Sequence, residues 1–346
     1  MILVTGAPGW LGTRLVRALV EGLPDYPGLV DALAGQQIRC LVVKGADVEV
    51  LRDIGEDIEL VEGDVRAPET LQAFFDGAEG ATLYQVAGVI HPQRLRDLHD
   101  INVTGVQNVL SCASNAGVRR AVVISSNSAT GYSRDHEVLF DEETPYDPFM
   151  LYGLSKQGLE EAALAAHASG RIEVVVVRPC WFYGPDQPPR QTEFFRMIRD
   201  GKAPIVGDGL NKRSMSYVDH TCQAMVQAAG LEAAAGNIYW VADPKPYPMA
   251  EIVDTVERLL EQEFDVPVAH KRLKIPGFVC DIALAADWSM QKVGLYEKRI
   301  HVLSEMNKTI ACSVDRAIRD LGYEPRVSLE EGMRRSLAWC RERGLL

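Results

Sequence analysis

The stretch that decides the fold is residues 2–12, which read ILVTGAPGWLG. Ile2–Val4 predict a short buried strand, and the apolar pattern of Leu11–Glu21 predicts a helix directly after it. Three glycines between them recur every third residue; the first permits a tight turn, the second lets backbone approach a pyrophosphate, and the third lets helix and strand pack closely. Unpaired N–H groups at the start of the helix favour the binding of a phosphate group. The stretch predicts a phosphate cradle made of Gly6, Pro8, Gly9, Trp10, Leu11 and Gly12.

Further short apolar segments alternate with helical patterns along the first half of the chain. The expected strands are Ile38–Val43, Ile58–Val61, Thr82–Val86, Ala121–Ser125, Ile172–Val177 and, later, Ile238–Val241. The expected helices between them are Pro68–Asp76, Asp97–Asn115 and Leu151–Ala168. This alternation is typical of a parallel sheet covered on both faces, so the predicted class is α/β, a Rossmann-type doubly wound sheet.

After Arg178 the pattern loosens into loops rich in proline and glycine, which indicates where a second lobe departs from the sheet. We expect a dinucleotide-binding domain over residues 1–178, with a returning segment near 214–243, and a smaller, mainly helical C-terminal substrate lobe from 179–213 and 244–346. The lobe ends in an amphipathic helix, Leu329–Arg343. The role of Leu23–Gln37, which is longer than a tight turn needs, stays open.

Composition narrows the class of protein. With 36 Lys and Arg against 48 Asp and Glu, the formal charge is 36 − 48 = −12, and no basic stripe is present, which argues against a nucleic-acid partner. The seven cysteines form no C-x-x-C pair, and the seven histidines show no metal spacing, so no metal site is expected and each histidine is interpreted as a surface or packing residue. No apolar run is long enough for a membrane span; Pro276–Trp288 is predicted to be a buried helix, with peripheral membrane contact as the alternative. The scattered cysteines, which suggest no disulfide framework, fit a reducing cytoplasm best.

Tyr152 and Lys156 are the first catalytic candidates. Their i, i+4 spacing on a predicted helix puts phenol and ammonium on one face. A nearby cation lowers the pKa of a phenol, so Tyr152 can exchange a proton with a substrate oxygen while hydride moves to or from a nicotinamide. Ser126, at the end of the fifth strand, is the preferred hydroxyl donor, with Ser128 second; other serines of this turn are expected only to satisfy the strand end.

Other residues are expected at the cofactor. The second strand ends in Val43-Lys44 without the carboxylate that usually holds the adenosine ribose, so a 2′-phosphate is not repelled, and Lys44 or Arg39 could pair with it. A solvated turn lysine is the alternative, which leaves NAD and NADP close to a tie. Asp64 can accept from adenine or serve as a loop carboxylate. The small pair Ala87-Gly88 leaves room for the nicotinamide side.

In this order, the motifs resemble those of the extended short-chain dehydrogenase/reductases, the superfamily of nucleotide-sugar epimerases, dehydratases and 3β-hydroxysteroid-type dehydrogenases. The segments that carry the resemblance are the cradle, Gly63-Asp64, Asn102-Val103-Thr104-Gly105, the serine turn, Tyr152/Lys156, Arg178-Pro179 through Pro185, and Arg213 through Asp219. The resemblance implies bound NAD(P), a catalytic set of Ser126, Tyr152 and Lys156, and cofactor-binding roles that extend to Val65, Asn102 and Pro179. For Asn102, a structural role inside a helix is the alternative.

The substrate depends on the positions that differ within the superfamily. Asn127 and Ser128 stand where sugar dehydratases place an Asp-Glu pair, so a dehydratase is disfavoured. Trp181 and Phe182 form an apolar wall where epimerases bind a diphosphate. Arg213 resembles the arginine that grips such a diphosphate, unless it pairs with Asp219.

The expected enzyme is therefore an NAD(P)-dependent oxidoreductase for a bulky, apolar, 3β-hydroxysteroid-like alcohol or ketone. A nucleotide-sugar 4-epimerase with retained NAD is the alternative, and a non-catalytic cofactor sensor is a third possibility. Apolar residues of the C-terminal lobe, among them Phe278, Trp288, Met290 and Met306, are expected in the core, with lining of the substrate pocket as the second role. We expect a homodimer through Leu98–Leu110 and Leu151–Leu164, as in related enzymes.

Overall fold

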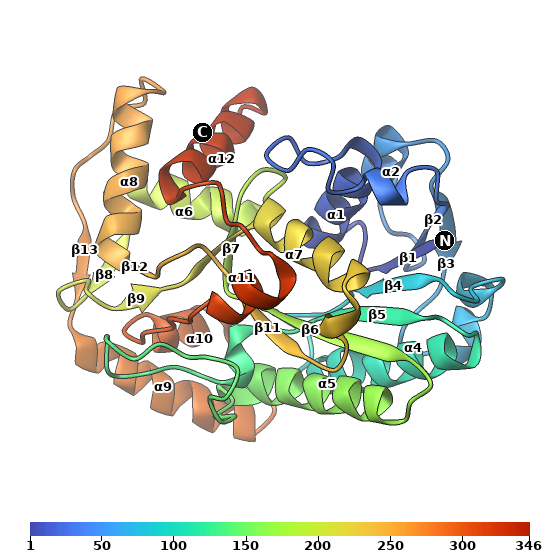
Figure 1. The fold of residues 1–346 in the computed structure, drawn as a ribbon. Helices are drawn as coiled ribbons and strands as arrows, with labels where there is room; N and C mark the ends of the chain where they lie inside the picture. The colour runs from blue at the N-terminus through green and yellow to red at the C-terminus, as the bar shows by residue number, and fades with distance from the viewer.

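The computed structural model describes residues 1–346, and its centre is a seven-stranded parallel sheet (Figure 1). The strands are parallel and lie in the order β11-β6-β5-β4-β1-β2-β3. From β1, the chain builds the sheet outward first on the side of β2 and then on the side of β4, so the switch point lies between β1 and β4. Their bounds are β1 Ile2–Thr5, β2 Ile38–Val42, β3 Glu59–Glu62, β4 Thr82–Gln85, β5 Arg120–Ile124, β6 Glu173–Pro179 and β11 Ile238–Val241. The predicted fold class is confirmed, and each predicted strand is present to within about two residues.

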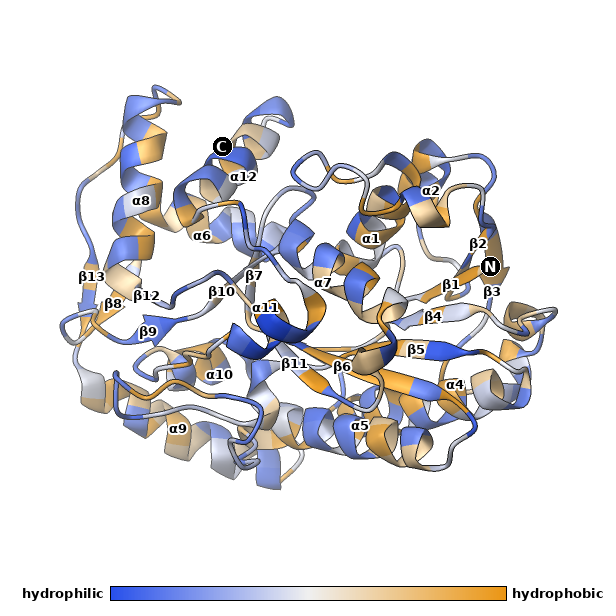
Figure 2. Ribbon diagram, viewed as in Figure 1, coloured by the Kyte–Doolittle hydropathy of each residue, from blue (hydrophilic) through white to orange (hydrophobic).

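Helices cover both faces of this sheet, which explains why apolar residues of its strands are buried on both faces (Figure 2). One face packs against α1 (Trp10–Glu21) and α7 (Val218–Gly230). The other packs against α4 (Gly105–Asn115) and α5 (Met150–Ala168). A short helix, α2 (Glu49–Ile54), precedes β3. Two predicted helices differ: Pro68–Asp76 forms two short 3₁₀-helices, and the helix before α4 is α3 (Arg96–His99) joined to it by a π-helical turn.

The remaining elements lie beside the carboxyl ends of the strands. Three two-stranded sheets pair β7 with β10, β8 with β13 and β9 with β12. Their bounds are β7 Trp181–Tyr183, β8 Pro204–Val206, β9 Lys212–Arg213, β10 Met215–Tyr217, β12 Tyr247–Pro248 and β13 Leu273–Ile275. The helices here are α6 Pro189–Arg199, α8 Met249–Gln262, α9 Gly277–Lys292, α10 Lys298–Glu305, α11 Asp315–Leu321 and α12 Leu329–Glu342.

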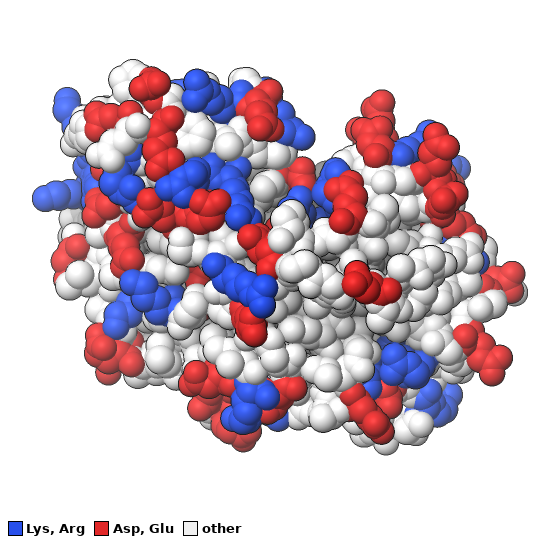
Figure 3. All heavy atoms as spheres, turned by 45° about the horizontal axis from the view of Figure 1, so that its top comes forward, with Lys and Arg blue, Asp and Glu red and all other residues white.

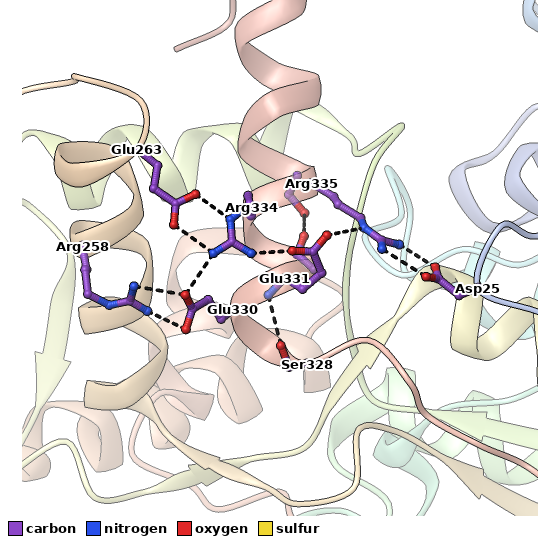
Figure 4. Close-up of polar contacts among 10 residues, drawn as sticks. Asp25, Arg258, Glu263, Ser328, Glu330, Glu331, Arg334 and Arg335 are labelled. Carbon is purple, nitrogen blue, oxygen red and sulfur yellow. Dashed lines mark hydrogen bonds and ion pairs between the residues drawn. The ribbon is translucent and has the colours of Figure 1, made fainter.

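The last helix, α12, joins the two ends of the chain (Figure 4). Ser328 caps its start by accepting from Glu331 N, and Arg334 pairs with Glu263, which directly follows α8. Arg335 reaches Asp25, with N–O distances of 2.5 and 3.1 Å. The neighbouring Tyr26 is buried and donates to the Glu324 carbonyl. The stretch 23–37 is therefore long because it reaches the C-terminal segment.

The prediction of a buried helix at Pro276–Trp288 is wrong about burial. The helix α9 forms where expected, but it is not buried: the side chains of Phe278 and Trp288 are 63% and 53% exposed. Its inward face instead carries a fully buried acid, Asp287. The expectation that Phe278 and Trp288 belong to the core is therefore wrong.

Charged side chains of both signs are interspersed on the face drawn in Figure 3, and no continuous basic stripe crosses it. None of the helices combines the length and the apolar character that crossing a membrane requires.

Candidate active site

The glycine cradle lies between β1 and α1, as predicted. A Cβ on Gly6 would lie 2.5 Å from Ala87 N, and one on Gly9 would lie 2.7 Å from Gly6 O. A Cβ on Gly12 would lie 2.5 Å from Gly6 O. Each of these contacts is with backbone, which cannot move aside locally, and Gly6 also has a φ of +82° that favours glycine. The three positions therefore need glycine.

The other predicted cradle residues surround this turn. Leu11 is buried in the core, and Pro8 is partly exposed in the turn. Trp10 turns toward the later loops: its indole Nε1 donates to Pro185 O at 2.7 Å, and its ring lies 5.9 Å from that of Phe182. Trp10 thus connects the cradle to the predicted substrate wall.

The end of β2 decides between the two cations proposed for a 2′-phosphate. Arg39 is not available, because it pairs with Glu59 at 2.8 Å and donates to the carbonyls of Phe74 and Asp76. Lys44 is exposed in the turn that follows the strand. The Arg39 alternative is therefore wrong, and Lys44 stays a prediction.

Asp64 lies at the end of β3 and is already engaged. Its carboxylate forms an ion pair with Arg66 at 2.5 Å and accepts from Arg66 N. The guanidinium holds the pKa of Asp64 below its ordinary value. The contact with adenine expected for Asp64 stays a prediction. Val65 beside it is buried, and its carbonyl accepts from Asn108.

Asn102 holds the backbone that follows β4. Its side-chain oxygen accepts from Val89 N at 2.8 Å, and its nitrogen donates to Val89 O at 2.9 Å and Ser155 Oγ at 3.0 Å. Ala87 N donates to Thr5 Oγ1 in the same region. A Cβ on Gly88 would lie 3.6 Å from Lys156 Nζ. Asn102 therefore fixes the loop that lies against the lysine.

Tyr152 and Lys156 lie on one face of α5, with the Lys156 Nζ 6.0 Å from the phenol ring centroid. Lys156 is buried and donates to Ile124 O at 3.1 Å; burial lowers its pKa to about 8. Burial raises the pKa of Tyr152 to about 12, while a hydrogen bond from Ser126 lowers it. The expected depression of the phenol pKa by the ammonium is thus not seen, because Lys156 lies toward the strand end.

The serine turn separates its members by role. Ser125 donates to Glu160 at 2.5 Å, and Glu160 also binds the buried Arg178, so Ser125 is structural as expected. Ser126 lies close enough to the Tyr152 phenol to lower its pKa, and the Ser126 Oγ lies 3.4 Å from Ser128 Oγ. The structure thus brings Ser126 to Tyr152, with Ser128 beside Ser126.

The predicted substrate wall begins where β6 ends at Pro179. Trp181 and Phe182 follow on β7, and both are half-buried. The Trp181 ring lies 5.3 Å from Phe194, and the Phe182 ring faces Trp10. The wall is therefore aromatic and continuous with the cradle.

The contacts of Arg213 show that the expected alternative, a pair with Asp219, is wrong. Asp219 instead binds Arg14 of α1 at 2.5 and 2.8 Å. Arg213 donates to the Glu305 carbonyl at 2.6 Å. Burial lowers its pKa, and the Glu305 carboxylate opposes this. Arg213 is therefore held by α10.

Three residues were not found from the sequence. His301, interpreted as a surface or packing residue, is buried and lies 2.7 Å from Asp287. Glu305 and Arg190 lie close enough to act on the charge of Tyr152: the carboxylate raises the pKa of the phenol and the guanidinium lowers it. The Glu305–His301 spacing of four was the one available signal, and alone it indicates only a helix face.

The cradle fits the nicotinamide dinucleotide that the motifs imply. Its three glycines leave backbone exposed to a phosphate, and Lys156 uses one ammonium proton on Ile124 O, which leaves two for a ligand. Together with the reversal of strand order between β1 and β4, these features define a dinucleotide-binding α/β enzyme fold.

The comparisons identify the family. Residues 2–242 match the model of the NAD dependent epimerase/dehydratase family, and the chain belongs to that family. An uncharacterized protein, y4nL of Sinorhizobium fredii, is 47% identical over 99% of this chain and 96% of its own. A 2-alkyl-3-oxoalkanoate reductase of Stenotrophomonas maltophilia is 28% identical over 96% of this chain and 97% of its own.

Among solved structures, the dTDP-glucose 4,6-dehydratase DesIV of Streptomyces venezuelae, with NAD and TYD bound, is similar at a TM-score of 0.72. It is 26% identical, and the match covers 99% of this chain and 98% of that one. The resemblance to extended short-chain dehydrogenase/reductases is thereby confirmed, as is a nicotinamide dinucleotide as the class of cofactor. The chain is an enzyme of this family.

Proposed function

We propose that this enzyme is an NAD(P)-dependent oxidoreductase that interconverts a secondary alcohol and a ketone on a bulky, largely apolar, 3β-hydroxysteroid-like substrate. The observation that carries the proposal is the meeting of Ser126, Tyr152 and Lys156 at the carboxyl edge of the sheet, beside the cradle. We propose that residues 1–178 and 214–243 bind the dinucleotide and that 179–213 and 244–346 bind the substrate.

The proton chemistry follows from the side chains. A bound nicotinamide dinucleotide supplies or accepts the hydride. Tyr152 keeps its proton at neutral pH, because its pKa is raised to about 12, and so it is ready to protonate the oxygen of a ketone. Ser126 donates a second hydrogen bond to the same oxygen. The Lys156 ammonium offsets the negative charge that remains on the phenolate.

The proposed substrate class rests on the wall of Trp181 and Phe182. Both rings offer apolar surface, and a diphosphate against them would leave charge unpaired. Arg213, which resembles the arginine that grips a diphosphate, already donates to Glu305 O and lies near its carboxylate. The similarity to a reductase named for 3-oxoalkanoates supports a ketone substrate.

A nucleotide-sugar 4-epimerase with retained NAD is the second candidate. It is favoured by Arg213, which donates to the backbone of Glu305 in the wall of the cavity that Asn127 and Ser128 also line, and by the similarity to DesIV, a dTDP-glucose 4,6-dehydratase. The Glu305 carboxylate near Arg213 disfavours it, because a second anion there would be repelled.

Two further proposals concern the cofactor and the assembly. The exposed Lys44 admits NADP as well as NAD. We also propose a cytoplasmic homodimer that forms through α4 and α5.

The test is the fate of the cofactor. The purified enzyme is mixed with reduced NADH or NADPH and a panel of apolar ketones, and absorbance of the reduced nicotinamide is followed. The proposal expects a steady loss, one cofactor per alcohol formed. Conversion of a nucleotide sugar with no net absorbance change would support the epimerase instead.

A further inference from the structure

A chain of three titratable side chains, Asp287, His301 and Glu305, links α9 to α10. His301 Nδ1 lies 2.7 Å from Asp287 Oδ2, and His301 Nε2 lies 3.4 Å from Glu305 Oε1. Asp287 and His301 are only 1% and 6% exposed. A buried carboxylate that binds one imidazole nitrogen orients the ring and leaves the other nitrogen to face the next group. Here that next group is Glu305.

The inner end of this chain is fixed to the helix that carries Tyr152. Asp287 Oδ1 accepts from Gln291 Nε2 at 2.9 Å, and Gln291 Oε1 accepts from Leu151 N at 3.1 Å. Leu151 directly precedes Tyr152 at the start of α5. The position of His301 is therefore coupled to that of the catalytic helix.

The outer end is open. The Glu305 side chain is 32% exposed, unlike the two residues behind it. It lines a small cavity together with residues of the serine turn and its surroundings: Asn127, Ser128, Gly131, Tyr132, Phe149, Lys308 and Ile310. Glu305 and Ser128 therefore line one cavity, and the charge of Glu305 also reaches the Tyr152 phenol, whose pKa it raises.

The groups around Glu305 shift its pKa in both directions. Burial raises its pKa, while His301 and Arg213 lower it and Asp287 raises it. The pKa of His301 is raised, because its bond to Asp287 and the charge of Glu305 outweigh burial. Lys308 on the same wall is occupied by Asp281 at 3.0 Å, and His91 binds Tyr296.

We infer that Glu305 is a second acid–base residue, which removes and returns the proton on the carbon next to the reacting carbonyl. His301 and Asp287 are positioning residues behind it. The inference rests on the proposed function, since it needs a ketone held by Ser126 and Tyr152. Asn127 and Ser128 carry no acid or base on their side of the cavity, so the carboxylate of Glu305 supplies one from α10.

The step is balanced without any change of oxidation state. The carboxylate of Glu305 takes the proton from the carbon, and the C–H electron pair becomes the carbon–carbon double bond of an enol. The carbonyl π pair moves to oxygen, which takes the phenol proton of Tyr152. Reversal restores the ketone, so the enzyme can exchange the hydrogen at this carbon with solvent.

The test is deuterium exchange. The enzyme is incubated in D2O with oxidised NAD or NADP, which prevents reduction, and with a saturated 3-oxosteroid or cyclohexanone as probe. Mass spectrometry follows deuterium at the carbons next to the carbonyl. We expect exchange above the buffer rate, and a loss of about 10²-fold in Glu305→Gln, the scale of acid–base catalysis. Glu56→Gln, which changes an exposed glutamate outside α9 and α10, is the matched control and should exchange as the wild type does.

A second variant separates proton chemistry from folding. In His301→Gln the cation that lowers the pKa of Glu305 is gone, so the rise of exchange with pH should move to higher pH. A purely structural role would lower the rate at every pH alike and would overturn the inference.

The outcomes distinguish the two proposals. Reduction of a probe with NADH or NADPH, without enzyme-dependent exchange, overturns the role of Glu305 and leaves the proposed function standing. Exchange that Glu305→Gln retains also overturns the role. Exchange without reduction supports Glu305 and contradicts hydride transfer, and a failure of both reactions overturns both proposals.

Discussion

Gly12→Ala should weaken cofactor binding, because the added methyl group meets backbone and not side chain. Its Cβ would lie 2.5 Å from Gly6 O and 2.7 Å from Ala7 N, which are parts of the cradle itself. In a helix, alanine is ordinarily favoured over glycine by about 1 kcal/mol. Overpacking costs about 1–3 kcal/mol, so we expect the free energy of unfolding to fall by up to about 2 kcal/mol.

The assay pairs thermal unfolding with titration of NADH and NADPH. A loss of that size lowers the Tm by about 2–4 °C per kcal/mol in a large domain. Displacement of the cradle should raise the Kd of the dinucleotide about tenfold or more, which corresponds to about 1.4 kcal/mol. Gly277→Ala is the control: it starts α9, and no atom lies within 4 Å of its Cβ. Gly12→Ala with wild-type affinity and Tm would refute the packing argument.

Three other changes test separate parts of the site. Lys44→Ala should weaken NADPH but not NADH binding in paired titrations; equal effects on both would show that Lys44 does not contact the 2′-phosphate. Ketone reduction should fall as the pH rises through about 8, where the Lys156 ammonium loses its proton, and a rate that stays flat well above this range contradicts the role of that charge. Asp25→Asn should cost about 0.5–1 kcal/mol, because Arg335 holds the pKa of Asp25 below its ordinary value. That pair stabilises the fold above the ordinary carboxyl pKa, so the Tm difference should vanish as the pH falls through the lower folded pKa; a constant difference would point to another cause.

The elements that could be predicted from the sequence are those encoded locally. The cradle needs only a strand, three spaced glycines and a helix, and all lie within residues 2–12. Tyr152 and Lys156 share a face because a helix places positions i and i+4 together. The parallel sheet covered on both faces followed from the alternation of strands and helices.

Features that depend on distant partners could not be read in this way. Asp219 is 205 residues from Arg14 in sequence, and Asp25 is 310 residues from Arg335. For the same reason, the length of the 23–37 stretch had no explanation before its contacts were known. Sequence separation of this size leaves no periodic signal.

The predicted burial of α9 was wrong for a different reason. An apolar segment such as Pro276–Trp288 indicates a helix but not which face turns inward. The structure buries Asp287, because His301 binds it, and leaves Phe278 exposed. The contact between Asp287 and His301 therefore accounts for a polar inward face that the apolar pattern did not predict. The candidate role of Glu305 depends on the same contact and could not be predicted either.

The most direct test of the central claim is Tyr152→Phe, which removes one oxygen and keeps the ring. With a ketone that the wild type reduces, the variant should bind NADH or NADPH with unchanged affinity, while turnover falls by about 10²-fold or more, the scale of lost acid–base catalysis. Near-normal turnover in Tyr152→Phe would contradict the assignment of Tyr152 as the proton donor.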